Sequence, residues 1–233
     1  MPIWHPSPNF GPRRDGLEPS LVVLHYTAMA SAEAALDRLS DPDAEVSAHY
    51  LIGADGTLWQ LVREADRAWH AGQGEWRGHG DVNSRSVGIE LDNRGDHPFA
   101  EAQMAALERL LPEIMGRWSI PAHGVIGHSD MAPGRKRDPG RKFDWRRLAR
   151  QGLALDPDVD PAALRDSRPA PPDAFDAPLR ALGYSGNVPL ETRIGAFLMR
   201  FRPQRMGSPS RGDLALALGA AETLGIDRTT PTA

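Results

Sequence analysis

Short apolar runs separated by polar, glycine-rich segments occupy the first two thirds of the chain and predict a sheet covered by helices. Residues 21–27 form a nearly continuous apolar run with β-branched members, typical of a strand buried on both faces. Residues 47–52 and 57–62 flank an Asp-Gly dipeptide, so we expect an antiparallel hairpin. Further strands are expected at 86–92 and 125–126. The expected fold class is α/β, with a mixed sheet flanked by helices.

Apolar residues at helical spacing predict helices over 32–39 and 100–118. Ser31 is placed to cap the first of them, and Asp144 to cap a later short helix. Pro112 lies inside the second pattern, where it predicts a kink or a split.

Two stretches carry neither pattern. Residues 1–20 are rich in Pro, Gly and Arg and predict an extended lead-in. Residues 69–83 are rich in glycine and predict a long irregular loop. Loops of that length inside a folded domain are often functional.

The last third of the chain has a different organisation. Residues 155–172 are rich in Asp, Pro and Ala, which predicts a linker between a domain at 1–154 and a second one at 173–226. In the second we expect three helices, at 173–182, 189–202 and 211–224. An apolar stripe on the middle helix indicates the core of a small helical domain, and its members are Ile194, Phe197, Leu198 and Phe201. The tail, 227–233, is expected to fray.

Composition and charge bear on the partners, the cysteine chemistry and the location to be expected of this protein. The chain has 233 residues, no cysteine, a formal net charge of −4 and no long run of one sign, so nothing suggests a nucleic-acid partner. Disulfides and thiolate metal ligands are excluded. No stretch is apolar enough for a membrane span, and the N-terminus lacks the basic and apolar regions of a signal peptide. We therefore expect a cytoplasmic protein, or a periplasmic one if a signal peptide has been removed.

The candidate chemistry centres on residues 127–140, where glycines and prolines surround His128, Lys136 and Asp138. Like His128, His25 lies at the polar end of an apolar run, where an imidazole without a partner would cost desolvation energy. Two neutral imidazoles and one carboxylate form a common catalytic zinc set with an open fourth position. The alternative is a surface loop with solvated charges.

Glu90 is the candidate base for the attacking water, because a carboxylate at the end of a buried strand needs a partner or a role. Lys136 is the candidate cation for a developing oxyanion. A buried ion pair between these two residues is the structural alternative. The other histidines in loops are expected to be solvated, and they are His5, His79, His97 and His123.

Five segments, in order, resemble one family. They are His25-Tyr26-Thr27-Ala28, Ser47-Ala48-His49-Tyr50-Leu51-Ile52, Ala68-Trp69-His70-Ala71-Gly72, Asn83 with Ser86-Val87-Gly88-Ile89-Glu90, and the 127–140 loop. Together they resemble the zinc-dependent N-acetylmuramoyl-L-alanine amidases of the AmpD type, which are related to phage T7 lysozyme and the peptidoglycan-recognition proteins. The region from Asp173 resembles, more loosely, the three-helix peptidoglycan-binding domain that follows some of these enzymes. A helical bundle that steadies the catalytic domain is the alternative.

The resemblance implies a role for each matching residue. The Zn²⁺ ligands are expected to be His25, His128 and Asp138, with Glu90 as the catalytic acid–base and Lys136 as the oxyanion partner. His49 is expected to support the site from behind. Substrate contacts are expected from Trp69, His70, Asn83 and Arg85.

The function implied is hydrolysis of the amide between the lactyl group of N-acetylmuramic acid and L-alanine, in muropeptides or peptidoglycan fragments. A non-catalytic peptidoglycan-recognition module is the main alternative, and a zinc hydrolase for another amide is a second. The sequence leaves the oligomeric state open.

Overall fold

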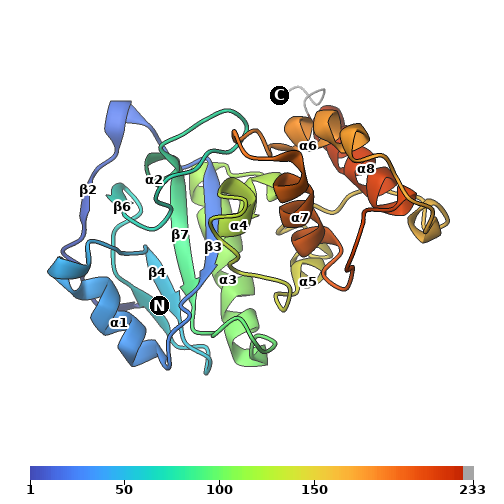
Figure 1. The fold of residues 1–233 in the computed structure, drawn as a ribbon. Coiled ribbons are helices and arrows are strands. Elements are labelled where there is room, and N and C mark those ends of the chain that lie inside the picture. The colour runs from blue at the N-terminus through green and yellow to red at the C-terminus, as the bar shows by residue number, and fades with distance from the viewer. Residues whose placement is uncertain (228–233) are drawn as a thin grey trace.

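A six-stranded mixed sheet forms the centre of the computed structural model, which describes residues 1–227 (Figure 1). The four strands on one side run parallel, β5 pairs antiparallel with β4, and β1 lies parallel to β5 at the edge. The expected mixed α/β sheet is therefore confirmed. In spatial order the strands are β1 (Ile3–Trp4), β5 (Leu58–Gln60), β4 (Tyr50–Ile52), β7 (Ser86–Leu91), β3 (Leu21–Tyr26) and β8 (Val125–Gly127).

Strand alternation decides which residues can meet at the site. Val22 and Leu24 pack, with the odd-numbered apolar residues of β7, against helix α3 (Glu101–Trp118). Successive side chains point to opposite faces, so His25 projects to the other face. Glu90 is the register partner of His25 on β7 and projects to the same side.

Helices also cover this second face. Helix α1 (Ala32–Ser40), capped by Ser31 as expected, packs on Leu51. The three C-terminal helices lie beside the sheet's other half in Figure 1. Phe197, fully buried on α7, shares one apolar cluster with Leu21 and Val23 of β3. These helices are α6 (Asp176–Leu182), α7 (Leu190–Phe201) and α8 (Arg211–Asp227), which confirms the three expected ones.

The segment at 155–172 is packed against the rest of the molecule. Leu155 and Ala170 are buried in the cluster that the sheet shares with the C-terminal helices. A short 3₁₀ turn, Ala163–Arg165, contacts α8. The division into domains stays a prediction, and most of the expected tail lies outside the described residues.

Several local expectations were wrong. Helix α3 continues through Pro112, so the split is absent while the kink stays a prediction. Its buried face, including Leu107, Leu111 and Ile114, keeps the helix on the sheet. The lead-in contains β1 and also β2 (Phe10–Pro12), which pairs with β6 (Asp66–Ala68) in a second, two-stranded sheet. Strands this short carry no periodic pattern that a sequence could reveal.

Short helices also interrupt the two expected loops. Helix α2 (Val82–Arg85) ends the glycine-rich stretch, and α4 (His128–Met131) opens the 127–140 segment. Helix α5 (Trp145–Ala149) is capped by Asp144, as expected, through the backbone N–H of Arg147 at 3.0 Å. No helix among residues 1–227 is both long and apolar enough to cross a membrane.

The shared apolar cluster predicts that sheet and C-terminal helices unfold together. We expect Phe197→Ala to lower the free energy of unfolding by about 3–5 kcal/mol, the usual cost of truncating a buried Phe. Urea unfolding followed by circular dichroism and by tryptophan fluorescence should give one transition at a lower midpoint. Leu218→Ala, at an exposed position on α8, is the control with little effect. A new early transition that leaves the rest of the unfolding curve unmoved would show that 173–226 is an independent domain.

Candidate metal centre and active site

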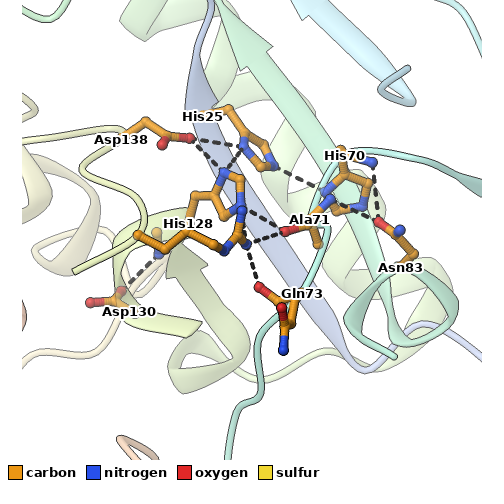
Figure 2. Close-up of polar contacts among 10 residues, drawn as sticks. His25, His70, Ala71, Gln73, Asn83, His128, Asp130 and Asp138 are labelled. Atoms are coloured by element: carbon orange, nitrogen blue, oxygen red, sulfur yellow. Dashed lines mark hydrogen bonds and ion pairs between the residues drawn. The ribbon is translucent and has the colours of Figure 1, made fainter. Parts of the chain in front are cut away.

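Three buried side chains converge at the carboxyl ends of β3 and β8 (Figure 2). His25 stands near the end of β3, His128 begins α4 directly after β8, and Asp138 lies in the loop that follows. His25 Nδ1, His128 Nδ1 and Asp138 Oδ2 are each 2.9 Å from the other two. The structure thus brings together the three predicted metal ligands.

The tautomer of His128 follows from its backbone partner. Its Nε2 lies 2.8 Å from the carbonyl oxygen of Ala71, which can only accept, so Nε2 carries the proton. The Nδ1 lone pair is therefore directed at the centre of the group. Asn83 fixes this backbone, because its Oδ1 accepts hydrogen bonds from the N–H groups of His70 and Ala71.

The tautomer of His25 is set by a longer chain of hydrogen bonds. The Ser86 hydroxyl donates to the carbonyl of Val82 at 2.5 Å, so its oxygen accepts from Nε2–H of His70 at 3.1 Å. The Nδ1 of His70 is then free to accept from Nε2–H of His25 at 3.0 Å. His25 also directs an unprotonated Nδ1 at the centre. Gly88 makes room for this arrangement, since a Cβ there would lie 2.4 Å from Cγ of His70.

This arrangement fits a bound metal ion. Two Nδ1 lone pairs and a carboxylate oxygen face one another with no proton between them, which is unfavourable without a cation in the middle. Burial, followed by the charge of His128, lowers the pKa of His25 to about 4 despite the opposing effect of Asp138, so His25 is neutral at pH 7. Two neutral imidazoles and one carboxylate suit zinc.

Glu90 and Lys136 line the same cavity of about 440 Å³ as the three convergent residues. The Oε2 atom of Glu90 is enclosed and has no hydrogen-bond partner among the residues that the structure describes, 1–227. Burial, and then the negative charge of Asp138, raise the pKa of Glu90 to about 8, although Lys136 acts in the opposite direction. The orphaned oxygen is available for a water or substrate proton in the cavity.

Residues 15–141 match the family model described as N-acetylmuramoyl-L-alanine amidase. The chain belongs to this family. It is 38% identical over 209 residues to the N-acetylmuramoyl-L-alanine amidase AmiD of Escherichia coli K12, covering 78% of this chain and 75% of AmiD. It is 35% identical to the 1,6-anhydro-N-acetylmuramyl-L-alanine amidase AmpD of Haemophilus influenzae, covering 60% of this chain and 86% of AmpD.

Solved structures extend the likeness to the C-terminal helices. A complex of E. coli AmiD with anhydro-N-acetylmuramic acid-L-Ala-D-γ-Glu-L-Lys superposes with a TM-score of 0.81 at 34% identity, over 91% of this chain and 92% of that one. AmpDh3 of Pseudomonas aeruginosa gives 0.78 at 30% identity, over 94% and 95%. An AmpD structure matches only 66% of this amidase-family chain, with a TM-score of 0.60.

The predicted substrate and support residues lie at different depths. Trp69 and His70 line the cavity, whereas Asn83 is buried behind the backbone at 70–71. Arg85 does not line this cavity, and its Nε donates to the carbonyl of Gly80. His49 lies beneath His70, accepting from the N–H of Gly88 and facing the carbonyl of Asp66. Their roles stay predictions.

The sequence patterns assign no role to three contributors to the ligand geometry. Ser86 lies in an expected strand and in one of the five family-like segments, where it is assigned no role, and the carbonyl of Ala71 has no side-chain signature at all. Arg135, which donates to this carbonyl at 2.7 Å, was passed over among three consecutive basic residues. Of these, only Ser86 left a signal, as a polar residue at the start of a buried strand.

Asp130 connects the site to the C-terminal helices. Its carboxylate is buried, accepting from the N–H of Gly127 at 2.7 Å, from the hydroxyl of Tyr184 at 2.6 Å and from Arg200 at 2.5 Å. Arg200 also donates to the carbonyl of Val125 on β8. Helix α4, which carries His128, is therefore held on one side by residues that follow α6 or belong to α7.

The hydrogen-bond chain behind His25 predicts that His70 controls metal affinity. We expect His70→Ala to weaken zinc binding about 10–100-fold, the usual effect of losing a group that orients a ligand. His70→Asn should keep most of the affinity, because Asn Oδ1 can take the place of Nδ1 as acceptor. Competition with a chromophoric chelator measures the affinity, and His97→Ala, at an exposed histidine, is the control. Unchanged zinc affinity in His70→Ala would exclude this role.

The raised pKa of Glu90 predicts a pH effect in the metal-free protein. Between its ordinary pKa of 4.5 and about 8, the folded state holds a proton that the unfolded state has released. Stability therefore falls as the pH rises through this range. The unfolding free energy of the wild type minus that of Glu90→Gln should therefore decrease from pH 5 to pH 8. Glu222→Gln, at an exposed glutamate, should show no such trend, and a difference that grows with pH would contradict the assignment.

Proposed function

We propose that this chain is a zinc-dependent amidase that hydrolyses the lactyl–L-alanine amide of muropeptides and peptidoglycan fragments. The carrying observation is the convergence of His25, His128 and Asp138 in one cavity with Glu90 and Lys136. Membership of the amidase family and the AmiD complex with an anhydromuramyl tripeptide support this substrate class.

His25, His128 and Asp138 would hold the metal through Nδ1, Nδ1 and Oδ2. Zinc at this position supplies a Lewis acid that polarises the scissile carbonyl and acidifies water. The hydrogen bonds from His25 to His70 and from His128 to Ala71 keep both rings in the liganding tautomer.

Glu90 carries the proton in the proposed reaction. In its ionised form, which the positive charge of a bound metal would favour, the Glu90 carboxylate takes a proton from the attacking water as the new C–O bond forms at the lactyl carbonyl. It then returns the proton to the amine nitrogen of L-alanine as the C–N bond breaks. Lys136 offers its ammonium to the negative charge that develops on the carbonyl oxygen between the two steps. The products are a free lactyl carboxylate and a peptide with a free amino group.

The proposal is tested by incubating the purified protein with anhydro-N-acetylmuramic acid-L-Ala-D-γ-Glu-L-Lys and following the products by mass spectrometry. We expect release of the tripeptide, loss of release with a chelator, and recovery with zinc. Glu90→Gln should lower kcat about 10²–10⁴-fold with zinc still bound, since it removes the proton acceptor. Glu222→Gln is the matched control.

Two outcomes would overturn parts of this proposal. Full activity of zinc-loaded Glu90→Gln would remove the assigned role of Glu90. A wild-type protein that binds zinc and muropeptide and cleaves neither fragments nor sacculi would favour the recognition module. We propose that the protein acts in the cytoplasm, with the periplasm as the alternative. Cell fractionation with an antibody to the chain tests this location.

A further inference from the structure

A second cavity, of about 620 Å³, has a strongly basic lining. It lies between the start of α5 and the segment that follows α7. Asp138 lines the candidate site and Arg141, three residues later, lines this cavity, so one turn of the chain forms part of both walls. We name it the basic pocket, and its cationic residues are Arg141, Lys142, Arg146, Arg200, Arg202 and Arg205.

The basic pocket carries an excess of positive charge. Its six cations meet three carboxylates: Asp144 in the lining, Asp130 against Arg200, and Asp213, which faces Arg202 and Arg205. Three positive charges are left over, in a chain with a formal net charge of −4. A concave surface lined by one sign of charge concentrates ligands of the opposite sign.

Part of the lining is fixed and part is free. Arg141 Nη1 donates to the carbonyls of Pro203 and Arg205 at 3.0 and 3.1 Å. Arg200 is buried and lies 4.2 Å above the ring of Trp145. Lys142 and Arg146, by contrast, are exposed, and their side chains make no hydrogen bond or ion pair with any residue of the described range 1–227. The pocket is therefore already shaped, with two cations available at its mouth.

We propose that the basic pocket binds the carboxylates of a stem peptide adjacent to the one being cleaved, so that the preferred substrate is polymeric peptidoglycan. This inference rests on the proposed function. The peptide in the AmiD complex contains a γ-linked glutamate, whose α-carboxylate is free, and ends in a second carboxylate. A glycan strand with several such peptides presents a row of carboxylates, with which guanidinium and ammonium groups form charge-assisted hydrogen bonds.

One half of the basic pocket comes from the region that carries the candidate site, and the other half comes from the C-terminal helices. Residues 141–146 follow the 127–140 loop, which carries His128 and Asp138, and residues 200–205 close the pocket from the end of α7. The C-terminal helices thereby contribute side chains to substrate binding next to the site, in addition to holding α4 through Asp130.

The test compares Lys142→Ala/Arg146→Ala with Arg63→Ala/Arg109→Ala, a control that removes the same charge from exposed positions outside both cavities. Co-sedimentation with purified sacculi measures binding, and kcat/KM is measured on sacculi and on the single-stem anhydromuramyl tripeptide. We expect the first variant to bind sacculi about tenfold more weakly, equivalent to about 1.4 kcal/mol. Its sacculus-to-fragment ratio of kcat/KM should fall by a similar factor. The control should keep both values.

Sacculi whose carboxylates have been amidated with carbodiimide identify the bound group. Wild-type binding should fall to the level of the pocket variant, and the variant should lose nothing further. Equal binding of wild type and variant to untreated sacculi would overturn the proposal, as would an equal loss of kcat/KM on both substrates. If the wild type cleaves nothing, the proposed function fails, while the sedimentation arm still decides whether the pocket binds carboxylates.

Discussion

Three buried lone-pair atoms from His25, His128 and Asp138, mutually 2.9 Å apart, set the main constraint on this structure. Without a cation they repel one another, and each of them is also withdrawn from water. The fold supplies acceptors behind both imidazoles, so that each ring turns its unprotonated nitrogen inward. One acceptor is a backbone carbonyl and the other is a second histidine backed by a serine. Metal affinity and ligand geometry thus depend on residues that need not touch the metal.

The same constraint explains why the C-terminal helices are integrated with the sheet. His128 sits on a helix of only four residues, which has little stability of its own. Asp130 in that helix is buried among Gly127, Tyr184 and Arg200, so residues from the far end of the chain hold it in place. The apolar cluster that joins β3 to Phe197 packs α7 against the sheet as well. The AmiD and AmpDh3 structures match 91% and 94% of this chain, whereas the AmpD structure matches 66%.

Charge is distributed unevenly around the site. Its cavity holds the buried carboxylate of Asp138 and the partly buried Glu90, whereas the basic pocket, which begins three residues after Asp138, has three cations more than carboxylates. The buried carboxylates of the site cavity suit proton transfer and metal binding at a single amide bond. A row of cations suits an extended anionic polymer, because each contact is weak and several act together.

The sequence alone determined five of the strands (β3, β4, β5, β7 and β8), the amphipathic helices and the five polar residues of the candidate site. Buried strands and helices leave periodic apolar patterns, and His25, Glu90 and His128 stood out as polar groups at the ends of such runs. Only the tertiary structure decided what stands behind those residues. The carbonyl of Ala71 has no side chain to read, and β1 and β2 are too short to show a period. The contact of Asp130 with Tyr184 and Arg200 joins residues 54 and 70 positions apart. Such contacts arise from the packing of distant segments, and a local pattern carries no record of that packing.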